Sequence, residues 1–314
     1  MRHATVNPAL PVIDSHHHIW NLKDIPWLQG TMLPRIFGDY SGMRRDYSIE
    51  EFRSDLAASQ VVKSIYVQAN WAPDKALEEV AWVQSVADIH GYPHAIVGYA
   101  DLARDDVGNL LDAQMRHANM RGIRQQLHWH ANPQYRFAER PDLMNAPAWR
   151  RGFKELADRG LVFDLQVFSR QMADCAALAK AFPGVKFVLS HAGMQEDRSE
   201  EMLALWRSGM QELAACPNVY AKLSGLGTFA HRCDSALWKP IVDETVALFG
   251  ARRCMFGTNF PIEKLWTTYD TIVGVARACI AHLTENEQRA VLHDTAVSVY
   301  RLEGTSINPV LRAA

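Results

Sequence analysis

Three consecutive histidines, His16, His17 and His18, end an apolar strand-like run near the N-terminus, VIDSHHHIW (12–20). Histidine is a common metal ligand and a common general base near neutral pH, so either chemistry could reside here. A purification tag is a longer histidine run in flexible surroundings, whereas this one lies inside a patterned segment. Side chains alternate across a strand, so His16 and His18 share a face and His17 points to the other.

Eight short runs rich in apolar and β-branched residues recur along the chain and predict strands. They span residues 12–18, 63–70, 94–102, 121–127, 161–167, 186–193, 219–226 and 254–261. Segments with helical spacing lie between them, and Ser48 with Glu51 and Thr284 with Glu287 fit the capping-box spacing. The alternation, with no hairpin turns, predicts a single (β/α)8 TIM barrel over residues 1–314. An open doubly wound sheet is the alternative.

Functional sites on a TIM barrel lie at the C-terminal ends of the strands. His16 and His18 end the first predicted strand, His191 ends the sixth, and Asn259 ends the eighth. Four polar groups from three strands are therefore expected to meet at one mouth. Asp14 would share the face of His16 and His18 one step deeper, where we expect it to orient a histidine or close the barrel floor.

Composition narrows the classes of partner. The 314 residues are 48% hydrophobic and 22% charged, with a formal net charge of −2, which is typical of a globular protein without nucleic-acid or lipid affinity. No apolar stretch is long enough to cross a membrane, and the N-terminus lacks a secretory signal, so we expect a cytoplasmic protein. The five scattered cysteines contain no Cys-x-x-Cys pair, and we expect them to be reduced and mostly buried. A small-molecule substrate is the expected partner, and a homodimer is left open.

These motifs resemble the amidohydrolase superfamily, and more closely its branch of small-lactone hydrolases, which includes sugar-acid lactonases and 2-pyrone-4,6-dicarboxylate lactonase. The resemblance covers nearly the whole chain and rests on His16-x-His18, VQAN (67–70), GIRQQL (122–127), SHAGM (190–194), KLSGL (222–226) and GTNFPIEKLW (257–266). It implies hydrolysis of an ester-type ring bond, with His16, His18 and His191 lining the reaction centre.

The chain departs from the superfamily pattern in two places. The family's eighth strand ends in an aspartate that binds metal or accepts a proton from the attacking water, whereas this chain has Asn259. An amide cannot be a general base, and it is a weaker metal ligand. Dinuclear members add a lysine or another bridge on the fourth strand and a histidine on the fifth, where this chain has Arg124, Gln126 and Gln166. A binuclear centre is therefore not expected.

Two mechanisms follow from the resemblance. His16, His18 and His191 could hold a single Zn²⁺ that activates water. In metal-free members, side chains polarise the carbonyl and a protein group activates water. Here that group would be His191, His128 or Glu263, in this order, although Glu263 could equally be a solvated loop residue. Because the aspartate is lost, we expect either no metal or one weakly bound Zn²⁺.

Six side chains near strand ends are candidates for substrate binding: Arg124, His128, Gln68, Lys222, Trp20 and Trp71. Arg124 suits a carboxylate or a polarised carbonyl, although a structural ion pair is as common a role for a buried arginine. Lys222 could instead form a salt bridge across the barrel. The tryptophans would form apolar walls around a ring, or simply pack between loops.

Two further segments suggest binding functions. Residues 19–47 form the longest connection, are rich in glycine, proline and aromatic residues, and follow the first strand, so we hypothesise a lid insertion. GLGTFA (225–230) fits a dinucleotide fingerprint, but the next residues, HRCDS, do not open a helix. We therefore do not predict nucleotide binding there.

The leading functional hypothesis is a hydrolase that opens a small lactone of a sugar acid or a carboxylated ring. One alternative is a decarboxylase or C–C hydrolase acting on an aromatic-type acid. Another is a barrel that lost activity with the aspartate and now only binds a ligand.

Overall fold

A computed structural model describes residues 7–304 and contains eight parallel strands that follow one another in chain order around the sheet. Their bounds are β1 (Val12–His17), β2 (Val61–Val67), β3 (Ala95–Gly98), β4 (Met120–Ile123), β5 (Val162–Leu165), β6 (Phe187–Leu189), β7 (Val219–Leu223) and β8 (Cys254–Phe256). A parallel bridge between His17 and Phe260 joins β1 to the segment after β8. The predicted (β/α)8 barrel is therefore confirmed, and the open doubly wound sheet is wrong because its strand order would not be sequential.

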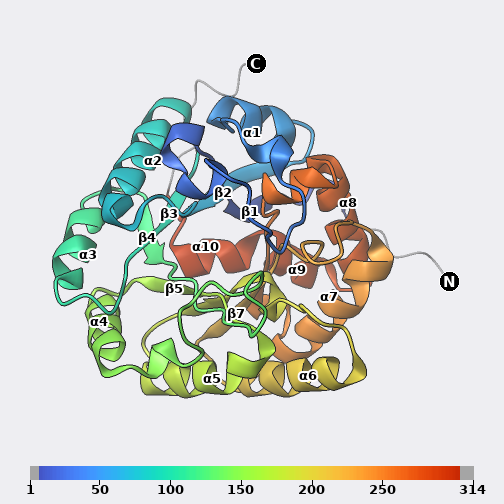
Figure 1. Cartoon of the computed structure of the whole chain (residues 1–314). Helices are drawn as coiled ribbons and strands as arrows, with labels where there is room; N and C mark the ends of the chain where they lie inside the picture. The colour runs from blue at the N-terminus through green and yellow to red at the C-terminus, as the bar shows by residue number, and fades with distance from the viewer. Residues whose placement is uncertain (1–6, 305–314) are drawn as a thin grey trace.

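Helices α1 to α8 surround the barrel, and α10 crosses the centre of the view in Figure 1. Their bounds are α1 (Ile49–Leu56), α2 (Ala76–His90), α3 (Val107–Met115), α4 (Pro147–Asp158), α5 (Met172–Ala181), α6 (Glu200–Ala214), α7 (Ser235–Phe249), α8 (Tyr269–Ile280), α9 (Glu285–Arg289) and α10 (Thr295–Tyr300). Within residues 7–304, no helix combines the length and the apolar character that crossing a bilayer would need.

The strands bury both faces. One hydrophobic cluster fills the space between the strands and the outer helices, and a second joins inward residues such as Ile13 and Val97 to Val299 and Tyr300 of α10. Strands buried on both sides carry continuous apolar runs, which is why they were visible in the sequence. Because α10 packs against the inward residues, it closes one end of the barrel and leaves the mouth at the other.

The first strand contains an irregularity that changes which side chains share a face. The pairing of β1 with β2 shifts register between Asp14 and His17. Asp14 accepts a hydrogen bond from Tyr269 of α8, whose ring contacts Phe52 of α1, and Phe52 stacks on His17. Asp14 therefore faces the helical layer with His17, and the prediction that it shares a face with His16 is wrong.

Asp14 joins the two ends of the sheet. Its carboxylate accepts hydrogen bonds from the backbone N–H and the hydroxyl of Thr258, at 2.9 and 2.6 Å, and from the backbone N–H of His16. Thr258 directly precedes Asn259, so this junction also sets where the chain leaves β8. Asp14 thus joins the two edges of the sheet on the side of the helices, whereas α10 closes the barrel floor that Asp14 was expected to close.

Candidate active site

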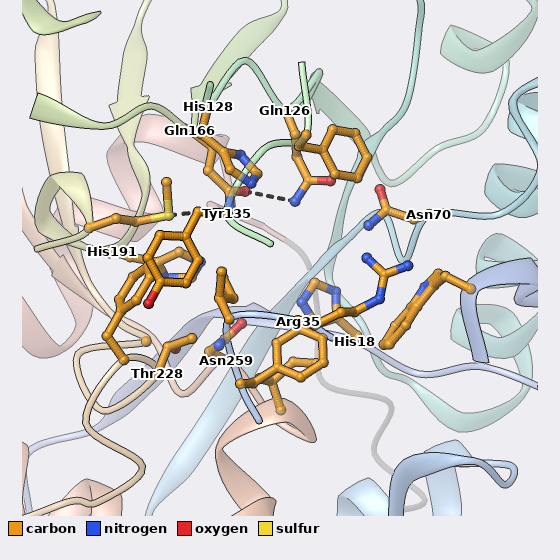
Figure 2. A pocket seen from close by; sticks show the side chains of 18 of the residues that line it. His18, Arg35, Asn70, Gln126, His128, Tyr135, Gln166, His191, Thr228 and Asn259 are labelled. Carbon is orange, nitrogen blue, oxygen red and sulfur yellow. Dashed lines mark hydrogen bonds between the residues drawn. The ribbon is translucent and has the colours of Figure 1, made fainter. Parts of the chain in front are cut away.

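A cleft of about 850 Å³, counted with the solvent space at its mouth, lies over the C-terminal ends of the strands. Its walls come from the turns after most of the strands and from segment 19–47, which contributes Trp20, Trp27, Arg35, Ile36 and Phe37. Figure 2 shows His18, Arg35 and Asn70 on one side of this cavity and His191, Tyr135 and Thr228 on the other. The fold thus forms a cavity where sites on TIM barrels lie.

The three candidate histidines lie together at the base of the cleft. The ring of His16 is centred 4.6 Å from that of His191 and 5.2 Å from that of His18. His18 and His191 line the cleft, whereas His16 is fully buried beneath them and its two ring nitrogens have no hydrogen-bond partner within residues 7–304. His17 points away and stacks on Phe52, as the strand alternation predicts.

Burial keeps these imidazoles neutral. It lowers the pKa of His18 to about 3, with a further contribution from the charge of Arg124. Burial also lowers the pKa of His191 well below its usual value, helped by the charges of Arg124 and Lys222. A neutral imidazole has one N–H and one lone pair. The Nδ1 atom of His18 lies 2.7 Å from the carbonyl oxygen of Val67, which can only accept, so Nδ1 carries the proton and Nε2 is an acceptor.

Several cleft residues have a backbone conformation that no strand pattern predicts. His191, Asn259 and Asn70 have φ of 56°, 61° and 60°, in the left-handed region, which costs on the order of 1–3 kcal/mol per non-glycine residue. β6 consequently ends at Leu189, earlier than predicted, and His191 lies in the following turn. Such turns redirect the side chains across the mouth.

The ring of His191 is fixed by the turn after β7. Its Nδ1 lies 2.9 Å from the Ser224 hydroxyl. The neighbouring Gly225 has a φ of 59°, and a Cβ atom at that position would lie 2.5 Å from Nδ1 of His191. Only glycine therefore allows this close approach.

Arg124 follows β4 and presents a positive charge to the cleft. It donates hydrogen bonds to the backbone carbonyl of Gln68 and to Oε1 of Gln166, while its buried Nε has no partner within the described chain. Burial lowers the pKa of Arg124 to about 10, so the guanidinium remains charged at neutral pH. Gln126 also donates to Gln166, at 3.2 Å. The side-chain amides of Gln126 and Gln166 therefore orient one another beside the charge of Arg124.

Asn259 contacts two functional candidates. Its polar side chain acts on His18 and on Glu263, and partly offsets the effect of burial on the pKa of each. Glu263 is fully buried and accepts hydrogen bonds from the Thr228 hydroxyl, at 2.9 Å, and from the indole N–H of Trp266, at 2.8 Å. The reading of Glu263 as a solvated loop residue is therefore wrong. Burial raises its pKa to about 8, so the carboxyl is mostly protonated at neutral pH.

The binding candidates separate into two groups. Arg124, His128 and Trp20 line the cleft, but Gln68, Lys222 and Trp71 do not. Lys222 is fully buried and pairs with Asp164 of β5. This contact is the salt bridge across the barrel that we gave as the alternative to substrate binding.

The other two residues outside the cleft have local structural contacts. Oε1 of Gln68 accepts a hydrogen bond from the backbone N–H of Asn70, at 2.7 Å. Trp71 packs against Trp82 of α2, with the ring centres 5.7 Å apart. Their contacts position the loop after β2.

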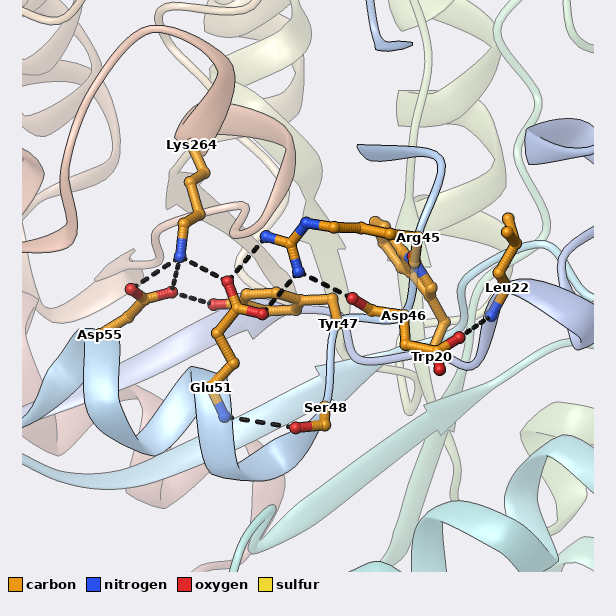
Figure 3. Close-up of polar contacts among 9 residues, drawn as sticks. All are labelled: Trp20, Leu22, Arg45, Asp46, Tyr47, Ser48, Glu51, Asp55 and Lys264. Carbon is orange, nitrogen blue, oxygen red and sulfur yellow. Dashed lines mark hydrogen bonds and ion pairs between the residues drawn. The ribbon is translucent and has the colours of Figure 1, made fainter. Parts of the chain in front are cut away.

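The proposed lid segment is anchored at both ends (Figure 3). Trp20 and Tyr47 exchange backbone hydrogen bonds, and the carboxylate of Glu51 on α1 pairs with Arg45 and with Lys264. Lys264 also pairs with Asp55, at 2.7 Å. These contacts fix the two ends of segment 19–47, and the middle of the segment, which lines the cleft, lies between them.

Arg35, Trp27 and Phe37 in this segment were not among the sequence candidates, although they line the cleft. They lie far from any predicted strand end, which is why the strand-end rule did not select them. The aromatic composition of residues 19–47 was the available signal.

The residues present do not fit a metal centre. Within residues 7–304, no group of three or more His, Cys, Asp or Glu side chains has an arrangement that could hold a metal ion. The charges of Arg124 and Lys222, which lower the pKa of His191, would also repel a divalent cation. Among the residues that the structure describes, no carboxylate lines the cleft to offset these charges.

Comparison with known proteins identifies the family. The amidohydrolase family model matches residues 13–302. The chain belongs to this amidohydrolase family. Its resemblance to the superfamily is thereby confirmed, and it is a hydrolase by membership.

Among relatives of this amidohydrolase, an uncharacterised protein of Sinorhizobium fredii is 41% identical, over 93% of this chain and 99% of the relative. An L-fucono-1,5-lactonase of Burkholderia multivorans is 31% identical, over 92% of this chain and 96% of the relative. A crystal structure of a zinc-bound amidohydrolase from Burkholderia multivorans is 28% identical, with a TM-score of 0.78 over 93% of this chain and 99% of that chain.

Proposed function

We propose that this amidohydrolase opens a small lactone by metal-independent hydrolysis, with His191 as the general base and Arg124 as the group that stabilises the oxyanion. The proposal rests on one observation: a neutral, oriented imidazole and a charged guanidinium line the same cleft. The L-fucono-1,5-lactonase among the relatives supports a lactone as the class of substrate.

His191 fits the role of base better than the other two candidates. Ser224 orients its ring at Nδ1, whereas Nδ1 of His128 is buried and without a hydrogen-bond partner in the described chain. Glu263 does not line the cleft, and because burial raises its pKa to about 8 it is mostly protonated at neutral pH. We therefore assign Asn259 and Glu263 to positioning, not to proton transfer.

The reaction proceeds in two steps. Water attacks the ester carbonyl of the ring as the lone pair on Nε2 of His191 accepts its proton, and Arg124 donates a hydrogen bond to the oxyanion that forms. The tetrahedral intermediate then expels the ring oxygen, and the imidazolium returns the proton to that alkoxide. The product is an open-chain hydroxy acid.

The lowered pKa of His191 affects the two steps differently. It keeps the imidazole unprotonated and available at neutral pH, but makes it a weak base. The same imidazolium is a strong acid, which favours protonation of the leaving alkoxide. An oxyanion beside Arg124 offsets the positive charge that lowers the pKa, so proton uptake becomes easier as the oxyanion forms.

The test is a lactone panel assayed with and without a chelator, alongside metal analysis of the protein. We expect the wild type to open at least one lactone after complete metal removal. His191→Gln should lower kcat by about 10²–10⁴-fold, the usual contribution of a general base. His282→Gln, which changes a half-exposed histidine outside the cleft, should not.

Three results would contradict the proposal: activity that chelation abolishes and Zn²⁺ restores, stoichiometric CO₂ release, or absence of any turnover. Asn259→Asp distinguishes an adapted enzyme from a barrel that has lost activity. We expect loss of activity, because a second carboxyl would face Glu263, whereas a decayed enzyme would gain it.

A further inference from the structure

The charges that line the cleft are all of one sign. Three arginines line it, Arg35, Arg124 and Arg136, and none of the lining residues is Asp or Glu. A cleft with such a field concentrates anions and disfavours cations. Hydrolysis of a neutral lactone requires only one of these charges, at the ester carbonyl.

The two outer arginines differ in how many hydrogen bonds they already donate. Nε and Nη2 of Arg136 donate to the carbonyl oxygens of His130 and Ala131. The Nε atom of Arg35 is buried and has no hydrogen-bond partner within residues 7–304. Its guanidinium carbon lies 5.1 Å from the ring centre of Trp27, so one face is covered.

The backbone at Arg35 is held in place by neighbouring loops. The side chain of Gln134 donates to the carbonyl oxygen of Arg35, at 3.0 Å, and the ring of His231 lies 3.2 Å from the carbonyl oxygen of Ile36. In Figure 2 Arg35 lies beside His18 and Asn70, on the side of the cavity away from His191. The guanidinium is thus positioned before a ligand arrives.

We propose that Arg35 forms a subsite for a carboxylate carried by the lactone ring, so that the substrate is a carboxylated lactone rather than a neutral sugar lactone. This inference rests on the proposed lactone hydrolysis at the same site. Arg124 then serves the ester carbonyl, and Arg35 holds the ring by its substituent. A guanidinium packed on an aromatic face keeps its N–H edge free, and this edge matches the two oxygens of a carboxylate.

The geometry also explains why a neutral ring is disfavoured. A ring that fills the cleft without an anionic group displaces water from the cleft and leaves the charge of Arg35 without a counter-charge. Discrimination between substrates is strongest where a buried polar group would otherwise stay unpaired. The guanidinium of Arg35, which donates no hydrogen bond within residues 7–304, becomes such a group when a ligand covers it.

The experiment compares one lactone ring bearing a carboxylate with the same ring bearing a carboxamide. We expect the wild type to prefer the acid, and Arg35→Gln to lower kcat/KM for the acid by at least about tenfold, the loss typical of a hydrogen bond to a charged group. The amide should be little affected, so the loss appears mainly in KM. Arg35→Lys should recover only part of the preference, since it keeps the charge but not the fork.

Arg104→Gln is the matched control, because it removes an exposed arginine paired with Asp106 and placed outside the cleft. It should leave the preference unchanged. Equal losses for acid and amide in Arg35→Gln, or no preference for the acid in the wild type, would overturn the proposal.

A binding measurement separates the two proposals. The probe is the saturated carbocyclic carboxylate of the same ring size, which cannot be hydrolysed, titrated by calorimetry. Binding that is lost in Arg35→Gln, together with no lactone turnover in the wild type, would sustain the subsite and refute the proposed function. Turnover of lactones without Arg35-dependent binding would do the reverse.

Discussion

At the scale of single residues, the informative substitution is the amide of Asn259. It lies between His18 and Glu263, and its oxygen and nitrogen can serve both without ionising. The site still contains a carboxyl group, that of Glu263, which lies four residues after Asn259 and contacts its amide. It is kept protonated by burial and hydrogen-bonded by Thr228 and Trp266. The site therefore has a neutral polar pair at this position.

This buried acid predicts a pH dependence of stability. Burial raises the pKa of Glu263 from 4.5 to about 8 in the folded protein. Its contribution is fully present below the unfolded pKa of 4.5 and is lost as the pH rises toward about 8, because only the unfolded chain releases the proton in this window. The loss amounts to at most about 1.4 kcal/mol per pH unit.

Urea unfolding at several pH values between about 5 and 9 measures this effect. Glu263→Gln mimics the protonated carboxyl and cannot ionise, so the stability of the wild type relative to this variant should fall across the window. Glu78→Gln, at an exposed position on α2, is the control. A constant difference between wild type and Glu263→Gln would show that Glu263 titrates normally.

At the scale of elements, the apolar runs predicted all eight strands because both faces of each strand are buried. Their ends could not be predicted in the same way. The left-handed turns at His191 and Asn259 come from tertiary contacts and leave no periodic signal. The shift in β1 that turns Asp14 away from His16 is likewise a property of strand pairing.

The burial of two neighbouring residues in the short turn after β8 could not be predicted from the sequence. Lys264 is partly exposed and pairs with Glu51 and Asp55, whereas Glu263 beside it is fully buried. From the sequence, Glu263 was equally a candidate base and a solvated loop residue. The Lys264 side chain points toward α1 and the Glu263 side chain points into the interior. This difference depends on where α1 packs, which a single sequence does not reveal.

The anchor of segment 19–47 predicts a measurable coupling to the cleft. Lys264→Met removes the cation shared by Glu51 and Asp55. This change loosens the anchored end of segment 19–47, the segment that carries Arg35. We expect faster hydrogen exchange across residues 19–47 and a KM raised by about two- to fivefold, since a loosened segment binds at an ordering cost of about 0.5–1 kcal/mol.

Lys239→Met provides the matched control, because Lys239 forms an exposed pair with Asp243 on α7, away from this segment. Exchange in residues 19–47 that is the same in Lys264→Met and in wild type would mean that the pairs do not hold the segment. Exchange that does not slow when substrate is bound would argue against a lid.

At the scale of the whole molecule, one buried ion pair joins three parts of the barrel. Lys222 of β7 pairs with Asp164 of β5, which also accepts a hydrogen bond from Tyr300 of α10, at 2.6 Å. All three side chains are inaccessible to solvent. The pair therefore links the wall of the barrel to the helix that closes its end.

A buried charge that loses its partner is far more costly than a pair removed entirely. Lys222→Met leaves Asp164 in the interior with Tyr300 as its remaining hydrogen-bond donor, and should lower the free energy of unfolding by about 3–5 kcal/mol. Lys222→Met combined with Asp164→Asn should recover most of that loss. Urea unfolding of the two variants measures the difference, and equal stability would show that the pair does not hold the barrel together. Because Lys222 lies outside the cleft, the folded single variant should keep a KM close to that of the wild type, whereas a substrate-binding lysine would raise it.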